Sequence, residues 1–568
     1  AGGDPAGRGL MLDLLEALDD QQRVVATTFD GPVCVLAGAG TGKTRSITHR
    51  IAYGVQTEQY QPDQILALTF TQKAAAEMAH RVRDLGVDGV AARTFHAAAL
   101  RQLQHFWPVV TGGYLPDIMP SKASLLARAL EGLKIQVDQA VLRDLAGDIE
   151  WRKVHAYTLE DYARHRLAKG DTMPGLLSIE VLTDIHERYE KLKDEAKRID
   201  FEDVLLAALG MLENEKRVLD QVRAQYRYFL VDEYQDVSPV QQRLLDMWLG
   251  DREDIVVVGD ASQTIYSFAG ASSEHLLEFG SRHPRATVVK LERNYRSGAH
   301  IVAIANQVMA GKPGALSLQA TTDDAIPVVR HRAATDESEA TFVATTIADL
   351  AAKGTSLDDC AILMRFGAQS LALETALRQQ GLSFRVQGAK AFFDEPHVQR
   401  AVMEIRGAAV AGIGGELQGV VDDILYGIGL TDNEPDHQGA ERGRYEDLVA
   451  LRDLARQASA TMTLMEFSDM LVRRSETGDS PSVGAVTLST VHSAKGQEWP
   501  VVFLVGLAEG QFPISYAKSM SAVEEERRLF YVGVTRARER LALSYAEAGR
   551  ERGHTREASR FLREISSV

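Results

Sequence analysis

Short apolar runs and longer amphipathic stretches alternate along this chain. Residues 33–36, 65–68 and 228–231 are apolar runs of strand length, whereas residues 45–53 and 73–85 carry apolar positions at helical spacing. Strands that alternate with helices in this way are typical of a parallel sheet covered on both faces. The pattern therefore predicts an α/β fold built on parallel sheets.

Two stretches interrupt this alternation. In residues 97–198, Leu, Ala, Arg and Glu recur at helical spacing and strand-like runs are few, and residues 397–482 form a further helical stretch. Strand-like runs return between residues 288 and 393, at 486–488 and at 501–505. We therefore expect two α/β domains, each with a helical insertion. The predicted parts are a first domain of residues 1–96 and 199–287, its insertion 97–198, a second domain of residues 288–396 and 483–568, and its insertion 397–482.

Composition narrows the class of protein. A chain of 568 residues is long enough for several domains with cores of their own. Cys34 and Cys360 lie in separate apolar runs without metal-ligand spacing, so we expect core positions in a reducing compartment. Since the sequence shows neither a secretory signal nor an apolar run of about 18 residues, a soluble, cytoplasmic protein without a membrane partner is expected. The net charge of −16 argues only weakly against a nucleic-acid partner, because binding needs a local basic groove.

A glycine-rich turn follows the first apolar run and leads into a predicted helix. It contains Ala37, Gly38, Ala39, Gly40, Thr41 and Gly42, followed by Lys43 and Thr44. Backbone N–H groups of such a turn, together with the helix N-terminus, bind phosphate. Lys43 can reach the β- and γ-phosphates, and the Thr44 hydroxyl can join a Mg²⁺ shell. The glycine spacing also fits a dinucleotide-binding turn, but a lysine–threonine pair favours a nucleoside triphosphate with a metal.

Two adjacent carboxylates, Asp232 and Glu233, end the apolar run at 228–231. Successive strand residues face opposite ways, so the two side chains are expected to do different work. One can hold a metal and its water ligands while the other polarises a water molecule. Alone, the pair is equally consistent with a solvated turn, and the glycine-rich turn is the partner that favours catalysis.

Nine short motifs lie between residues 18 and 562. They are Gln22, residues 37–44, 69–75, 94–96, 231–236 with Gln241, 258–266, 291–297, 486–498 and 524–537. In this order they resemble the motifs of the UvrD/PcrA/Rep helicases, superfamily 1A DNA motors that travel 3′ to 5′ on single strands. The resemblance implies two RecA-like P-loop domains and an ATPase that depends on Mg²⁺ and is stimulated by DNA.

The resemblance assigns the chemistry of ATP hydrolysis. Catalytic roles fall to Lys43, Glu233, Gln263, Arg296 and Arg536, and the Mg²⁺ ligands would be Thr44 and Asp232. Glu233 would orient or deprotonate the attacking water and Gln263 would sense the γ-phosphate. Phosphoryl transfer mainly needs positioning and neutralisation of negative charge, which suits Arg296 and Arg536 as arginine fingers. Because both arginines come from the second domain, hydrolysis would require the two domains to close over ATP.

The resemblance also assigns nucleotide and DNA contacts. Around the base and ribose it implies Gln22, Arg45, Tyr295 and Glu498, next to the glycine-rich turn. For single-stranded DNA it implies base stacking by Phe70, Tyr266 and Phe268, and backbone contacts by Thr94, His96, Thr490 and His492. Each aromatic residue could alternatively be an ordinary core side chain.

Two of the chain's departures from the family bear on its contacts with DNA. Phe268-Ala269 stands where the family usually has tryptophan and arginine, which puts stacking there in doubt. The second insertion is also short and acidic, since residues 397–480 hold 15 Asp and Glu against 8 Arg and no Lys. Gly427 and Gly429 lie in a turn that resembles the family's contact with the duplex backbone, but a helix connector would look the same. We expect autoinhibition and duplex grip to differ from those of the longer relatives.

Two functions remain open. The favoured one is an ATP-dependent helicase that acts on single-stranded and 3′-tailed duplex DNA, in repair, with repair or transcription proteins as possible partners. The alternative is a translocase that strips proteins from single strands and unwinds only weakly without a partner. A helicase fused to a nuclease is not expected, because the chain ends soon after residues 559–562.

Overall fold

The computed structural model describes residues 14–169, 173–267, 270–322, 326–387, 393, 395–431, 440–458, 462–476, 484–548 and 555–565. The chain divides into two compact units. The first unit comprises Ala1–Tyr295 and Gly311–Leu318, and the second comprises Arg296–Ala310 and Gln319–Val568.

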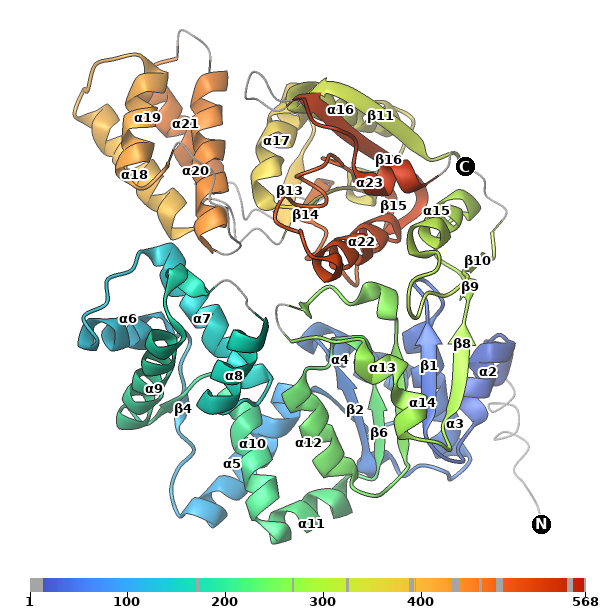
Figure 1. The fold of residues 1–568 in the computed structure, drawn as a ribbon. Coiled ribbons are helices and arrows are strands. Elements are labelled where there is room, and N and C mark those ends of the chain that lie inside the picture. The colour runs from blue at the N-terminus through green and yellow to red at the C-terminus, as the bar shows by residue number, and fades with distance from the viewer. Residues whose placement is uncertain are drawn as a thin grey trace. The chain divides into compact units, whose positions relative to one another are not determined.

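The first unit is built on a six-stranded sheet whose strands all run parallel. Its order is β3 (Ala91–Thr94), β2 (Ile65–Thr69), β6 (Tyr228–Val231), β7 (Ile255–Gly259), β1 (Val33–Ala37) and β8 (Thr287–Leu291). Figure 1 shows this sheet among its helices. The helices outside the insertion are α2 (Asp20–Thr27), α3 (Lys43–Gln56), α4 (Gln72–Asp84), α5 (Phe95–Thr111), α10 (Asp203–Asn214), α11 (Lys216–Gln225), α12 (Pro239–Leu249), α13 (Glu274–Leu277) and α14 (Phe279–Arg282).

Alternate residues of the strands supply two cores on opposite faces of this sheet. Val35 and Ala67 belong to the core that contains α3 and α4, whereas Cys34 and Leu68 belong to the core that contains α5, α10 and α12. Because both faces are covered, the strands are apolar throughout, as is usual for parallel sheets. The predicted α/β fold is confirmed, and both cysteines are buried.

The last strand of this sheet corrects a predicted boundary. The sequence assigned residues from 288 onward to the second domain, but β8 pairs with β1 in the first sheet, with Val35 opposite Val289. The first unit therefore extends to Tyr295. An apolar run shows that a strand exists but not which neighbour it pairs with, and that pairing depends on contacts distant in sequence.

The first helical insertion has a core of its own. Its helices are α6 (Ala123–Gly132), α7 (Gln139–Val154), α8 (Leu159–Lys169) and α9 (Ile179–Glu195), and its buried apolar residues lie between Met119 and Leu192. Two short strands, β4 (Asp117–Ile118) and β5 (Arg198–Ile199), pair at its base. Helix α5 does not belong to this core, because Ala98 and Leu103 pack in the core of the first sheet. The separate insertion thus begins later than the predicted residue 97.

The second unit contains another six-stranded parallel sheet. Its order is β11 (Val329–Thr335), β16 (Ala537–Ala548), β15 (Trp499–Leu504), β12 (Cys360–Met364), β14 (Val486–Thr490) and β13 (Phe384–Gln387). The accompanying helices are α15 (Ala299–Met309), α16 (Asp336–Ala352), α17 (Ser370–Gln379), α22 (Met520–Val534) and α23 (Arg560–Glu564). Two short strands remain: β9 (Arg293–Asn294) belongs to the first unit and β10 (Gln319–Ala320) to the second.

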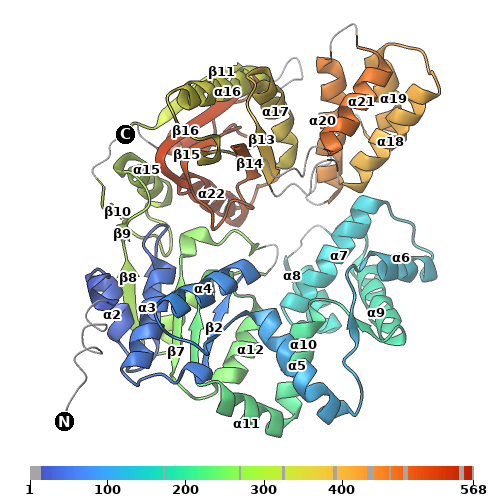
Figure 2. The ribbon, with the colours of Figure 1, turned by 180° about the vertical axis from the view of Figure 1, so that it is seen from behind.

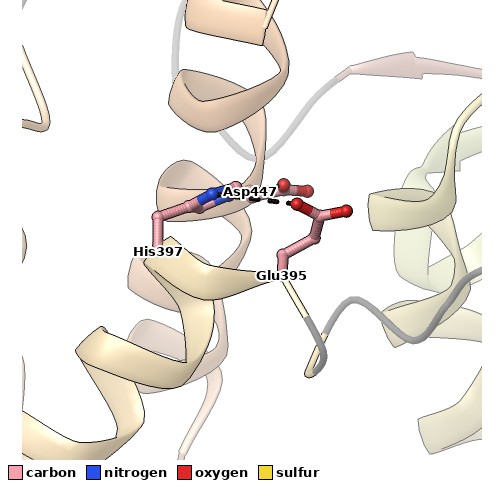
Figure 3. Close-up of side chains that lie close together, drawn as sticks. All are labelled: Glu395, His397 and Asp447. Carbon is pink, nitrogen blue, oxygen red and sulfur yellow. Dashed lines mark hydrogen bonds and ion pairs between the residues drawn. The ribbon is translucent and has the colours of Figure 1, made fainter. Parts of the chain in front are cut away.

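The described residues of the second insertion form four helices, visible in Figure 2: α18 (Pro396–Val410), α19 (Leu417–Gly427), α20 (Ala440–Gln457) and α21 (Leu464–Glu476). His397 at the start of α18 contacts Asp447 of α20 through Nε2, at 2.7 Å, while its Nδ1 lies 4.0 Å from Glu395 (Figure 3). This imidazole joins two helices of the bundle. Among the described residues, no helix is both long and apolar enough to cross a membrane.

Candidate active site and nucleic-acid interface

The glycine-rich turn connects β1 to α3 at the carboxyl edge of the first sheet. Gly40 and Gly42 have positive φ values of 70° and 80°, and Gly42 directly precedes the first residue of α3. A Cβ atom on Gly42 would come within 2.6 Å of the Gln22 side chain. Only glycine therefore gives this turn its curvature, which brings Lys43 and Thr44 to the helix N-terminus.

Three consecutive carbonyl groups of the turn are held by the rest of the unit. Asn294 Nδ2 donates to the Ala39 carbonyl at 2.7 Å, and the Tyr295 N–H donates to the Gly40 carbonyl at 2.9 Å. Gln22 Nε2 donates to the Thr41 carbonyl at 3.0 Å. These bonds fix the orientation of the peptide groups, and so the turn is preformed.

The acidic pair lies directly beyond β6 and divides its contacts between two neighbours. Asp232 Oδ2 lies 3.5 Å from Thr44 Oγ1, and Glu233 Oε1 lies 3.2 Å from Lys43 Nζ. Strand alternation is not what separates the two carboxylates, because β6 ends at Val231. Instead Glu233 takes a left-handed backbone conformation with φ of 52°, and the two carboxylates contact different partners, Lys43 and Thr44. A non-glycine residue in this region is strained, and such strain clusters at functional sites.

Burial and neighbouring charge shift the ionisation of this cluster. Burial alone would lower the pKa of Lys43, but the carboxylates of Glu233, Asp260 and Asp232 raise it above its usual value. Burial, together with the negative charge of Glu233, raises the pKa of Asp232 to about 7. Lys43 is therefore firmly cationic, while negative charge crowds around Asp232.

The cluster fits Mg²⁺ by the chemistry of its donors. Thr44 and Asp232 offer a hydroxyl and a carboxylate oxygen, the hard ligands that Mg²⁺ prefers. The two oxygens are 3.5 Å apart on one wall of the site, and a cation there would relieve the unfavourable burial of the Asp232 charge. Few protein ligands are usual for Mg²⁺, because this ion keeps several water ligands and binds substrate phosphates.

Hydrogen bonds extend the acidic pair to the end of the neighbouring strand β7. Gln235 Nε2 donates to Glu233 Oε2 at 2.5 Å, and Gln235 Oε1 accepts from the Asp260 N–H at 3.0 Å. Asp260 in turn accepts from Gln263 Nε2 at 2.8 Å. The predicted γ-phosphate sensor Gln263 is thereby connected to Glu233. Gln235, Asp260 and Asn294 stood inside the matched motifs, but their supporting roles depend on tertiary contacts.

The predicted base-binding residues of the first unit border the turn. Gln22 is buried and also accepts from the Asp19 N–H, so both ends of its carboxamide are engaged within the unit. Tyr295 is 49% exposed and donates to Asp19 Oδ2 at 2.6 Å. Arg45 is exposed on the first turn of α3. Their contacts with adenine stay a prediction.

The second unit brings its own predicted residues together around Thr535. Arg296 pairs with Glu498 at 2.5 Å and donates to the Thr535 carbonyl. Arg536 is buried and donates to the carbonyl groups of Val532 and Gln497 and to the Thr535 hydroxyl. Both guanidinium groups are thus held within this unit, and their role as arginine fingers stays a prediction.

Aromatic side chains of the first unit form a stacked pair beside the acidic cluster. The rings of Phe70 and Tyr266 are 5.4 Å apart and nearly parallel, at 13°. Phe70 is 43% exposed, which is unusual for a phenylalanine that only fills a core. A small cavity of about 20 Å³ connects this region to the carboxylates; its lining residues are Thr69, Phe70, Thr94, Phe95, His96, Asp232, Glu233, Val237 and Gln241.

His96 carries a second aromatic pair that the sequence did not indicate. The Phe201 ring lies 3.9 Å from the His96 ring at 12°, and Phe201 is 53% exposed. Burial lowers the pKa of His96 to about 4, so its imidazole is neutral near pH 7. Thr94 caps α5 by accepting from the Ala97 N–H. An aromatic residue between acidic neighbours was the only sequence signal for Phe201; Phe268, predicted to stack on DNA, lies outside the described residues.

The remaining predicted DNA contacts lie in the second unit. Thr490 ends β14, and its hydroxyl contacts Ser493, while burial and the nearby Arg365 and Lys495 lower the pKa of His492 to about 3. The Gly429 N–H donates to the Tyr426 carbonyl. The two residues beside Gly429 likewise donate to carbonyls of α19, so this turn, with Gly427 as the last residue of the helix, acts as a helix C-cap.

Comparison with known families and proteins agrees with this geometry. The model of the UvrD/REP helicase N-terminal domain matches residues 18–284, and that of the UvrD-like helicase C-terminal domain matches residues 289–409 and 432–548. The chain is 43% identical to ATP-dependent DNA helicase UvrD2 of Mycobacterium tuberculosis, over 97% of this chain and 82% of the relative. It is 30% identical to DNA helicase II of Escherichia coli, covering 97% and 88%, and 30% identical to ATP-dependent DNA helicase PcrA of Bacillus subtilis, covering 97% and 86%.

The pairing of Lys43 with Glu233 predicts an effect on nucleotide binding. Glu233→Gln keeps the shape of the side chain but removes a negative charge that competes with phosphate for Lys43. We expect ATP to bind roughly tenfold more tightly, about 1.4 kcal/mol, as measured by titration calorimetry with Mg²⁺ present. Glu213→Gln on the exposed face of α10 is the matched control. Unchanged or weaker ATP binding in Glu233→Gln would contradict the prediction.

Proposed function

Because the chain belongs to the UvrD-like helicase family, we propose that it is an ATP-dependent DNA helicase that hydrolyses ATP while moving 3′ to 5′ on single-stranded DNA. The observation that carries the proposal is the cluster in which Lys43 meets Glu233 and Thr44 meets Asp232. It combines a phosphate-binding turn, a cation and two differently placed carboxylates. Cytoplasmic location, a role in repair and action on 3′-tailed duplexes are parts of the same proposal.

The geometry supports a division of labour in hydrolysis. The turn and the N-terminus of α3 bind the phosphates, and Lys43 neutralises charge on the β- and γ-phosphates. Glu233, released from Lys43 by the nucleotide, orients the attacking water and accepts its proton. Gln263 donates a hydrogen bond to Asp260, and the Asp260 N–H donates to Gln235. Gln235 in turn donates to the carboxylate of Glu233. Thr44 and Asp232 would hold Mg²⁺, which supplies further neutralisation of phosphate charge.

Single-stranded DNA is the proposed activator of this reaction. The stacked Phe70 and Tyr266 offer an exposed aromatic face, and bases of any sequence can stack on such a face. His96 and Thr94 share the small cavity with Glu233, which supports a direct path from DNA to the reacting groups. The contacts of Thr490 and His492 with DNA are proposed from their motif alone.

Hydrolysis with and without DNA tests the proposed activity. We expect oligo-dT to stimulate ATP hydrolysis in the wild-type chain, because DNA engages residues that border the carboxylates. Glu233→Gln should lower kcat at saturating DNA by roughly 10²–10⁴, the usual contribution of a general base. Steady-state phosphate release measures both, with Glu213→Gln as the control. An absence of DNA stimulation, or full activity in Glu233→Gln, would reject the assignment.

The stacking platform predicts a separate defect in DNA affinity. Phe70→Ala removes an exposed ring and should raise the oligo-dT concentration for half-maximal ATPase by roughly 5–150-fold, since one stacked base is worth about 1–3 kcal/mol. Hydrolysis without DNA should not change. Tyr114→Ala, at an aromatic residue that is 97% exposed elsewhere in the unit, is the matched control. Equal half-saturation in Phe70→Ala and wild type would exclude Phe70 from the DNA track.

A second candidate function is supported by the Gly427–Gly429 turn. The N–H groups of Ile428, Gly429 and Leu430 all donate to carbonyls of α19, so they are engaged within the helix C-cap. The insertion around them is acidic and would attract phosphate poorly. These features favour a translocase that displaces bound proteins and separates strands weakly.

One comparison of rates separates the two candidates. On a 3′-tailed duplex a helicase should displace the strand at a rate similar to its release of streptavidin from biotinylated single-stranded DNA. A translocase should release streptavidin at least roughly tenfold faster than it displaces the strand, because it lacks grip on the duplex phosphates. Rapid-quench assays under identical salt measure both rates, with 5′-tailed DNA as the polarity control.

A further inference from the structure

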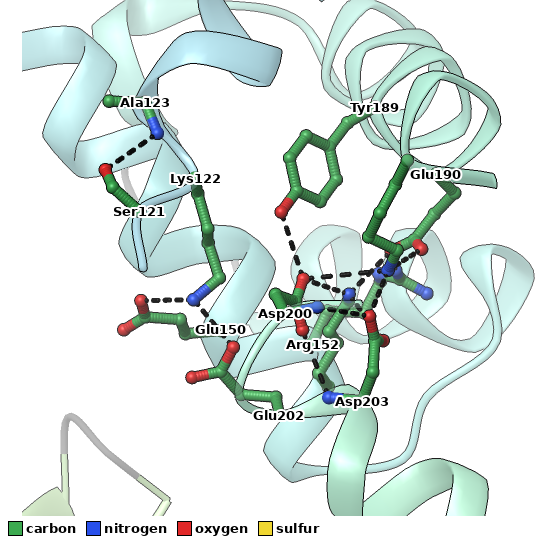
Figure 4. Close-up of polar contacts among 12 residues, drawn as sticks. Ser121, Lys122, Ala123, Glu150, Arg152, Tyr189, Glu190, Asp200, Glu202 and Asp203 are labelled. Atoms are coloured by element: carbon green, nitrogen blue, oxygen red, sulfur yellow. Dashed lines mark hydrogen bonds and ion pairs between the residues drawn. The ribbon is translucent and has the colours of Figure 1, made fainter. Parts of the chain in front are cut away.

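A buried network of charges lies where the first helical insertion joins the first sheet unit. Lys153 of α7 and Lys193 of α9 are 1% and 3% exposed, and their ammonium groups contact the carboxylates of Glu190, Asp200 and Asp203. The distances from Lys153 Nζ are 2.5 Å to Asp200 and 2.8 Å to Asp203. Figure 4 shows the carboxylates of Glu190 on α9, of Asp200 and of Asp203 at the start of α10 close together.

The network is balanced in charge and satisfied by further donors. Arg152 pairs with Glu190 at 2.7 Å, which brings three cations to three carboxylates. The Tyr189 hydroxyl donates to Asp200 Oδ2 at 3.0 Å. Burial alone would raise the pKa of Asp200, but Lys153 and Lys193 hold it well below its usual range. Asp200 is therefore charged at neutral pH, and removing one of its cations leaves a buried charge without compensation.

The two aspartates of this network flank Phe201. Asp200 and Asp203 also exchange backbone hydrogen bonds, since each N–H donates to the side chain of the other, at 2.9 and 3.1 Å. The next residue, Glu202, pairs with Lys122 at 2.6 Å. Every carboxylate in the segment 200–203 is thus anchored to the insertion. Phe201 is the one residue of the segment whose side chain instead lies on His96.

We propose that Lys153 and Lys193 are positioning residues for single-stranded DNA: by anchoring Asp200 and Asp203 they hold the exposed Phe201 ring on His96 as a preformed platform. The proposal rests on the proposed function, in which His96 borders the DNA track. In this proposal the insertion has a function in DNA binding, because its helices α7 and α9 supply the cations that hold the Phe201 ring in place. Holding the ring in place before DNA arrives lowers the entropy lost on binding.

A positioning role through Phe201 differs from a structural role in the way that mutations combine. Lys153→Met preserves length and removes charge, and Phe201→Ala removes the ring. Each should raise the oligo-dT concentration for half-maximal ATPase by roughly fivefold or more. Lys153→Met should leave hydrolysis in the absence of DNA and kcat at saturating DNA unchanged. In the double variant, Lys153→Met should add less than about a further twofold, because the ring that it positions is gone.

The controls and outcomes are defined in the full chain. Lys191→Met, at an exposed lysine of α9, should behave as the wild type. Asp203→Asn is a gentler change that keeps the side-chain volume and an oxygen for the Asp200 N–H, and it serves for the same cycle where Lys153→Met does not fold. Equal factors from Lys153→Met with and without Phe201, a fall in hydrolysis without DNA, or misfolding of both network variants would overturn the inference. Wild-type protein without DNA stimulation would instead reject the proposed function itself.

Discussion

The candidate active site of the first unit depends on the ion pair between Lys43 and Glu233. This ion pair joins the end of β1 to the end of β6, two strands that are separated in the sheet by β7. The parallel arrangement is what makes this possible, because all carboxyl ends reach the same edge. The backbone of Glu233 is strained, and its carboxylate accepts a hydrogen bond from Gln235 in addition to its contact with Lys43.

Crowding of charge explains why this site is prepared for a nucleotide. Three carboxylates surround one buried lysine, and burial together with the nearby charge of Glu233 raises the pKa of Asp232. A bound phosphate would replace Glu233 as the partner of Lys43. A divalent cation bound with it would relieve the repulsion between Asp232 and Glu233. The same carboxylates line the small cavity that reaches His96 and Phe70. Under the proposed function, DNA at the aromatic pairs and phosphate at the turn would both act on Asp232 and Glu233.

The sequence predicted most of this arrangement because its signals are local. The apolar run and the glycine spacing place β1, the turn and α3, and the run at 228–231 matches β6 in full. The boundary at residue 288 was wrong because the partner of a strand is chosen by tertiary packing. Phe201 went unnoticed for a similar reason. A half-exposed aromatic residue gains meaning only when His96, about a hundred residues away, lies under it.

The buried network shows how stability and function separate within one structure. Burying Lys153, Lys193 and their carboxylates costs desolvation energy that apolar side chains of similar volume would not. Such a network is therefore poorly explained as a source of stability alone. Charged contacts have strict geometry, whereas apolar contacts tolerate sliding, and so the network specifies one position for the segment around Phe201. Apolar contacts alone could attach the insertion to the sheet, but they would not fix the position of the Phe201 ring.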